Sequence, residues 1–230
     1  MTSLLLRLRR AALRSLFAFI YGPGATLYDF VAWSSSAGQW RTWQQAALET
    51  LPEDRLLEIG HGPGHLLLQV RSAGRFVVGV DFSHQMTRMA ARRLRREGWA
   101  ACVVRARAQQ LPFRSQAFNA AYSTFPSEYI LEPASASEAA RVVKPGGRIV
   151  VVPGVADITG RSMFDRLARG LYRVAGESVG STQGWDRAMN ELASRLGLHF
   201  RAESVAQDKA VVLRLVLDKP VGRRNHARDG

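Results

Sequence analysis

The amino-acid sequence predicts an α/β fold, in which helices cover both faces of a mostly parallel sheet. Short runs rich in Val, Ile and Leu alternate with longer helix-compatible stretches from Leu56 to Val152, as in parallel strands joined by crossover helices. A glycine-rich turn follows the first run. An acid ends the second run at the distance that a strand–helix–strand unit requires. Together these observations indicate an α/β domain with a ligand-binding turn.

The length of 230 residues suits one such domain with an N-terminal extension and is too short for two full domains. We divide the chain into an amphipathic helix and cap (1–50), the α/β domain (51–218) and a disordered basic tail (219–230). The single cysteine, Cys102, excludes an internal disulfide, and no Cys/His cluster has zinc-ligand spacing. The sequence therefore predicts a reducing compartment and no metal site.

The glycine-rich turn extends the first strand and reads Leu56-Leu57-Glu58-Ile59-Gly60-His61-Gly62-Pro63-Gly64. Alternate glycines let the main chain approach a ligand closely, and the following helix offers free N–H donors. The pattern E-x-G-x-G-x-G differs from the dinucleotide-binding G-x-G-x-x-G, because His65 and Leu67 stand where a third glycine is needed. His61 can contact a ligand from this turn, whereas His65 fits an ordinary turn position.

The second strand is expected over Arg75–Asp81, which places Asp81 17 residues beyond Gly64. A carboxylate at the end of a parallel strand can accept both hydroxyls of a ribose. A solvated turn aspartate is the alternative interpretation. Three further motifs follow in order: Gln110-Leu111-Pro112-Phe113, Phe118–Ser123 and Arg141–Val152.

The chain beyond Pro153 should contribute two helices and a terminal hairpin. Helix-compatible segments near 162–175 and 184–196 flank a Gly/Ser-rich link. Two strands, 199–205 and 210–217, are separated by a short polar stretch and should therefore pair with each other.

The motifs between residues 55 and 153 resemble those of the class I S-adenosylmethionine-dependent methyltransferases. The glycine turn is similar to that family's first motif, and 141–147 is similar to its R-V-L-K-P-G-G turn. The resemblance implies a Rossmann-like seven-stranded sheet, mostly parallel and in the order 3-2-1-4-5-7-6, with S-adenosylmethionine as cofactor. It also implies cofactor contacts at the turn and at the strand ends, from Glu58, Gly60, His61, Gly62, Gly64, Asp81, Phe82, Ala108, Gln109, Thr124 and Phe125.

The segment 123–129 lies beside the transferred methyl group in that family. By this resemblance Glu128 is the candidate base and Tyr129 its orienting partner. A helix-start acid and a packing aromatic are the alternative interpretations. The segment lacks the N/D-P-P-Y tetrapeptide of enzymes that methylate exocyclic amines of DNA bases, and Cys102, near the third strand, is no nucleophile for cytosine methylation. Nucleic acid is accordingly the less favoured substrate.

Arg107 departs from the family pattern, in which an aspartate at this place accepts from the adenine amino group. Arginine has only donors and cannot take that role. We expect Gln109 or a backbone carbonyl to replace the missing acceptor. Asn119 likewise replaces a usual aspartate.

Before the α/β domain the chain reads Leu27-Tyr28-Asp29-Phe30-Val31-Ala32 and then Ser36-Ala37-Gly38-Gln39-Trp40-Arg41-Thr42-Trp43. These segments resemble the region that precedes the core in the menaquinone and ubiquinone biosynthesis C-methyltransferases. By that resemblance Tyr28 contacts the cofactor or the acceptor, while Trp40 and Trp43 pack the cap. Residues 1–20 form an amphipathic pattern without acids, which suits a helix in an anionic membrane interface. A lid over the domain and an organellar presequence are the alternatives.

The net charge of +13 gives weak support to a nucleic-acid partner, since only three of the 32 basic residues are lysine and the arginine bias can reflect genome composition. The densest arginine cluster lies on the helix after Asp81, where most of its members should face solvent: Arg88, Arg92, Arg93, Arg95 and Arg96. A phosphate-binding stripe and a membrane contact are equal alternatives for this charge.

The sequence thus predicts a methyltransferase that acts on a hydrophobic small molecule, a quinone precursor or lipid, by in-line displacement. We expect a cytoplasmic protein, with peripheral attachment at the inner membrane face through residues 1–20. RNA or protein methylation, and a non-catalytic adenosylmethionine-binding protein, are the rival functions. The sequence leaves the oligomeric state open.

Overall fold

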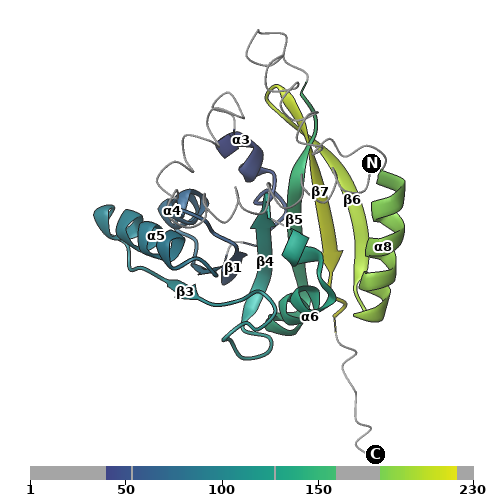
Figure 1. The fold of residues 1–230 in the computed structure, drawn as a ribbon, viewed down its shortest axis with the longest axis horizontal. Helices are drawn as coiled ribbons and strands as arrows, with labels where there is room; N and C mark the ends of the chain where they lie inside the picture. Colours follow the sequence, from purple (N-terminus) through teal and green to yellow (C-terminus); the bar gives the residue numbers. More distant parts are fainter. Residues whose placement is uncertain (1–39, 53, 127, 159–181, 222–230) are drawn as a thin grey trace, which may run out of the picture.

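The computed structural model describes residues 40–52, 54–126, 128–158 and 182–221, which form a seven-stranded sheet flanked by helices (Figure 1). The elements in chain order are α3 (Trp40–Gln45), β1 (Leu56–Ile59), α4 (His65–Ser72), β2 (Val77–Asp81), α5 (His84–Arg96), β3 (Val103–Arg105), β4 (Phe118–Thr124), η2 (Glu128–Leu131), α6 (Pro133–Val142), β5 (Val143–Ile158), α8 (Thr182–Arg195), β6 (His199–Gln207) and β7 (Ala210–Asp218).

The strand order is β3-β2-β1-β4-β5-β7-β6, which confirms the predicted order. Neighbouring strands from β3 to β5 pair in parallel. The terminal strands β6 and β7 form the predicted antiparallel hairpin, and β7 also runs antiparallel to β5. β5 continues to Ile158, beyond the predicted end of the motif, because β7 supplies partners for the additional residues. The expected helix over 162–175 lies outside the described residues.

Two apolar layers cover the sheet because side chains alternate along each strand. Leu56 of β1 packs in one layer with Trp43 and Leu67, which come from α3 and α4. Leu57 faces the opposite layer, where residues of α6 and α8 pack, among them Ala139. Burial on both faces explains why the parallel strands are continuously apolar.

Helix α5 begins as the sequence predicts. Ser83 is its N-cap, and the Ser83 hydroxyl accepts a hydrogen bond from the Met86 N–H at 3.2 Å. Four of the five predicted arginines of this helix are exposed: Arg88, Arg92, Arg95 and Arg96. Arg93 instead donates to the backbone oxygen of Pro63 in the glycine-rich turn.

Buried Arg214 of β7 ties the segment after α3 to the C-terminal hairpin. Its guanidinium donates to the Ala46 carbonyl and to Glu49, each at 2.8 Å, and its Nε donates to Glu203 at 2.7 Å. These contacts hold α3 near the carboxyl end of β4, where Gln44 Nε2 donates to Thr124 Oγ1 at 3.0 Å. Among the residues that the structure describes, no helix is both long and apolar enough to cross a bilayer.

Candidate functional site

The glycine-rich turn bends at the carboxyl end of β1, between β2 and β4. From β1 the chain continues to β2 and β3 on one side of the sheet and then to β4 and β5 on the other side. In open α/β sheets, ligands bind at such a topological switch point. Gly60 and Gly62 have φ values of +77° and +53°, in the left-handed region that side chains disfavour. The Gly60 N–H donates to the Val80 carbonyl at 2.7 Å, which fixes the bend against β2.

Gly64 connects the bend to α4 and also has a positive φ, of +81°. A Cβ at this position would lie 2.6 Å from the Cβ and 2.9 Å from the Cα of Ala90 on α5. Gly64 therefore lets two helices approach closely, and it does not itself line the cavity described below.

Asp81 lies directly beside the bend, as predicted. Its Oδ2 accepts from the Gly62 N–H at 2.9 Å, and its Oδ1 accepts from the Ser83 N–H at 2.8 Å. Each carboxylate oxygen has further acceptor capacity beyond these bonds. The carboxylate is thereby held in a fixed orientation at the wall of the cavity.

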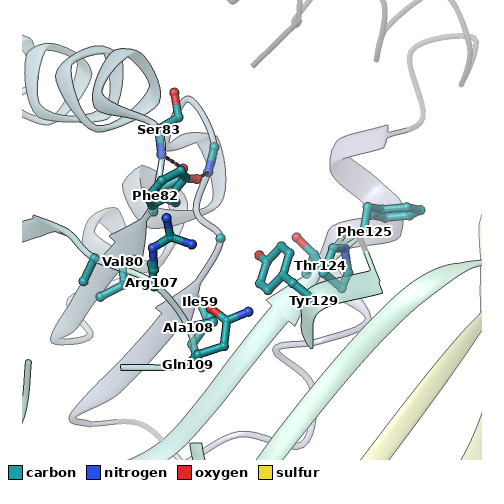
Figure 2. A pocket seen from close by; sticks show the side chains of 15 residues that line it. Ile59, Val80, Phe82, Ser83, Arg107, Ala108, Gln109, Thr124, Phe125 and Tyr129 are labelled. Carbon is teal, nitrogen blue, oxygen red and sulfur yellow. Dashed lines mark hydrogen bonds between the residues drawn. The ribbon is translucent and has the colours of Figure 1, made fainter. Parts of the chain in front are cut away.

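A cavity of about 260 Å³ opens beside the bend (Figure 2). Its walls come from the ends of β1, β2 and β4 and from the segments that follow β3 and β4. The lining residues are Ile59, Gly60, Gly62, Val80, Asp81, Phe82, Ser83, Ala106, Arg107, Ala108, Gln109, Thr124, Phe125, Pro126 and Tyr129.

Phe82, Arg107 and Gln109 lie across the cavity from the β4 end in Figure 2. Phe82 is 54% exposed, so part of this apolar residue is open to a ligand. The Arg107 guanidinium lies 4.4 Å from the centre of that ring. Gln109 Nε2 donates to Glu132 Oε2 at 2.7 Å.

Thr124, Phe125 and Tyr129 form the facing wall (Figure 2). Phe125 has a φ of +49°, which is unusual for a bulky residue. Its N–H donates to the Val152 carbonyl at 2.7 Å. The Phe125 ring points away from the cavity in Figure 2, with its centre 4.0 Å from that of Trp40 and 6.3 Å from that of Trp43, so it packs with these residues of α3 into an apolar layer of the fold.

Glu58 and His61 lie behind the bend, and neither lines the cavity. Burial raises the pKa of Glu58 to about 8; the hydrogen bond from the Tyr122 hydroxyl (3.2 Å) opposes this shift, and the charge of Asp81 adds to it. Burial lowers the pKa of His61, and the charge of Asp81 acts in the opposite direction. His61 Nδ1 donates to the Gly62 carbonyl at 2.7 Å. Both residues therefore lie in the layer that supports the turn.

Two of the predicted site residues are not placed. Tyr28 lies outside the described residues, and so does the side chain of Glu128, although its backbone begins η2. Conversely, two residues that contact the site were not predicted from the sequence: Gln44, which contacts Thr124, and Glu132, which contacts Gln109. Contacts across 80 and 23 residues carry no local sequence signal.

Comparison with known proteins agrees with the class that the fold and the cavity define, a Rossmann-like methyltransferase domain. A family model described as a methyltransferase domain matches residues 57–151. The demethylmenaquinone methyltransferase of Mycobacterium marinum is 34% identical over 165 residues, which cover 69% of each chain. Other proteins of that name, from Clavibacter sepedonicus and Mycolicibacterium gilvum, are matched over 46% and 58% of their length.

Solved structures share the fold at low sequence identity. A crystal structure from Methanococcus maripaludis, assigned to the S-adenosylmethionine-dependent methyltransferases, has a TM-score of 0.64 at 15% identity and covers 87% of this chain and 94% of its own. Phosphoethanolamine N-methyltransferase 2 of Haemonchus contortus, solved with S-adenosylmethionine, has a TM-score of 0.55 at 19% identity, over 80% of this chain and 53% of its own. The chain belongs to the class I S-adenosylmethionine-dependent methyltransferases, and S-adenosylmethionine is its cofactor.

We expect Asp81→Asn to weaken binding of S-adenosylhomocysteine by about tenfold or more, because an amide replaces a carboxylate that can accept both ribose hydroxyls. The asparagine Nδ2 would also face a backbone N–H, so the variant loses stability as well. Calorimetry should therefore compare S-adenosylhomocysteine with its 2′-deoxy analogue. The native chain should discriminate between the two ligands and the variant should not; equal discrimination by both would contradict the ribose contact.

Proposed function

We propose that this enzyme methylates a quinone precursor. The observation that carries the proposal is the aromatic ring of Tyr129, which lines the cavity on the same wall as Thr124. A flat, apolar acceptor fits such a wall, because aromatic surfaces stack with offset or tilted rings. The similarity to proteins named demethylmenaquinone methyltransferase supports the same acceptor class.

The residues of the site would act mainly by positioning. When bound, S-adenosylmethionine supplies a methyl group that its sulfonium already activates. The bend and Asp81 would hold the nucleoside end, while Thr124 and Phe125 would align the acceptor with the carbon–sulfur bond. Such alignment can lower a barrier by roughly 7 to 11 kcal/mol.

The balance of the reaction also requires a proton acceptor. The new bond joins the methyl carbon to the acceptor atom, the carbon–sulfur bond breaks, and S-adenosylhomocysteine leaves with the electron pair. The acceptor must then lose a proton to a nearby base. We keep Glu128 as the candidate base and Tyr129, which lines the cavity, as the residue that orients it.

The test is methyl transfer to defined acceptors by the purified chain. We expect a mass gain of about 14 units on a demethylated naphthoquinol with an isoprenoid tail, and none on phosphatidylethanolamine or RNA. Asp81→Asn serves as the control for background methylation. Product on the phospholipid or RNA, with none on the quinol, would overturn the proposed acceptor.

We further propose that residues 1–20 bring the enzyme to an anionic membrane, where a lipid-soluble quinone resides. Their pattern of arginines and leucines supports an interfacial helix. Deleting residues 1–20 should abolish co-flotation with vesicles that contain phosphatidylglycerol. Flotation that persists after the deletion would contradict this attachment.

A further inference from the structure

Gln109 has a fixed amide orientation at the cavity wall. Its Nε2 donates to Glu132 Oε2 at 2.7 Å, and a carboxylate can only accept, so the nitrogen of the amide is the atom committed to Glu132. The amide oxygen is then the acceptor that Gln109 can offer to a ligand. Glu132 precedes α6 as its N-cap residue, so the orientation is set from an element outside the cavity.

The neighbouring side chains supply surfaces and donors rather than acceptors. Phe82 offers its exposed ring, and the Arg107 guanidinium lies 4.4 Å from the centre of that ring. The guanidinium of Arg105 lies 5.7 Å from the same centre, and its Nε donates to the Phe82 carbonyl at 3.0 Å. Both arginines have donors only. A purine stacked at Phe82 therefore meets donors on this side.

Recognition of the adenine amino group requires a hydrogen-bond acceptor on the protein. The ring nitrogens of adenine accept, but its exocyclic amino group donates. Asp81 adjoins the bend, where its remaining acceptor capacity is assigned to the ribose hydroxyls. Beside Phe82 and Arg107, Gln109 therefore supplies a side-chain acceptor, its Oε1.

We propose that Gln109 selects adenine by accepting from its amino group, and that Glu132 is a positioning residue that keeps the Gln109 oxygen toward the cavity. Arg107 binds the same base by donating to the ring nitrogens of the base and by stacking on it, and it makes no hydrogen bond to the amino group. This inference rests on the placement of the nucleoside beside Asp81 in the proposed function.

The affinities for S-adenosylhomocysteine and S-inosylhomocysteine distinguish the role of Gln109 from that of Arg107. S-inosylhomocysteine carries a carbonyl oxygen in place of the amino group, so it can accept but not donate at that position. The native chain should bind S-adenosylhomocysteine about tenfold more tightly, which is the value of one hydrogen bond in a desolvated site. Gln109→Leu should reduce the ratio to near one. Arg107→Ala should weaken binding of S-adenosylhomocysteine without lowering the ratio, because a guanidinium only donates and cannot favour the amino group over the carbonyl oxygen.

Glu132→Ala should also lower the ratio, because the Gln109 amide can then rotate. The matched control is Glu138→Ala on α6, which removes a carboxylate that accepts from the Leu111 N–H at 2.7 Å without touching Gln109. This control should change stability and leave the ratio intact. A native ratio retained in Gln109→Leu would overturn the inference while leaving the cofactor site in place; failure of the native chain to bind S-adenosylhomocysteine at all would overturn the proposed function with it.

Discussion

Gly60→Ala is expected to lower the affinity for S-adenosylhomocysteine by at least about a hundredfold and to destabilise the fold by about 2 kcal/mol or more. Gly60 has a φ of +77°, which costs an alanine roughly 1–2 kcal/mol. The added Cβ would also lie 2.2 Å from the hydroxyl oxygen of Tyr129. Either the bend or Tyr129 must therefore move, and both belong to the cavity wall. Calorimetry and thermal unfolding measure the two effects.

Gly74→Ala is the matched control for this substitution. Gly74 has nearly the same φ, +78°, but a Cβ there meets no atom within 4 Å. It should cost only the backbone strain, roughly 1–2 kcal/mol, and leave cofactor affinity unchanged.

A double substitution identifies the clash itself. Tyr129→Phe removes the hydroxyl that meets the new Cβ, so Gly60→Ala should be less damaging in that background than in the native chain. Additive effects of the two substitutions on affinity and stability would show that the Tyr129 hydroxyl does not clash with the added Cβ.

The strand order was expected from the family resemblance, whereas the sheet and the bend were predictable because the signals that specify them are local. Alternation of apolar runs, the glycine turn after β1 and the acid at the end of β2 place the sheet and the bend without any knowledge of distant contacts. The approach of Asp81 to Gly62, at 2.9 Å, follows from parallel pairing of β1 with β2. The terminal hairpin was likewise predictable from two β-rich runs with a short polar link.

The family resemblance placed Thr124, Phe125 and Tyr129 at the site, but the conformation of this facing wall could not be predicted in the same way. A positive φ is favoured by glycine and asparagine, so nothing in the sequence marks Phe125 as left-handed. Its ring position depends on Trp40, which is held from an element far away in the chain. Arg214 similarly secures the segment after α3 through contacts spanning more than 160 residues. Such contacts depend on the packed fold rather than on local propensity.

Glu58 is another residue whose orientation could not be predicted from the sequence. The family resemblance implied a cofactor contact, whereas the structure places its side chain only 1% exposed, beside the Tyr122 hydroxyl and outside the cavity lining. Sequence patterning locates the acid on β1 but not the face to which it points. The consequence of that orientation is a carboxyl group that remains protonated at neutral pH, because burial raises its pKa to about 8.

Glu58→Gln is therefore expected to make stability less dependent on pH. In the native chain the pKa of Glu58 is raised from 4.5 in the unfolded state to about 8 in the folded state. Its favourable contribution is complete below pH 4.5 and falls as the pH rises toward 8, at about 1.4 kcal/mol per unit, on the order of 5 kcal/mol in total. A glutamine keeps an acceptor for Tyr122 and does not ionise. Chemical denaturation from pH 4 to 9 measures the difference.

The slope of that difference with pH is the decisive quantity, because an unpaired amide N–H₂ in the variant adds a cost of about 1–3 kcal/mol that does not change with pH. Glu138→Gln provides a control of opposite sign. The hydrogen bond from Arg141 lowers the pKa of Glu138, so this carboxylate stabilises the fold above its unfolded pKa and loses the effect as the pH falls. Glu138→Gln should thus be destabilising at neutral pH and converge with the native chain in acid, whereas Glu58→Gln should gain on the native chain as the pH rises. Parallel stability curves for Glu58→Gln and the native chain would mean that Glu58 ionises as readily in the fold as outside it.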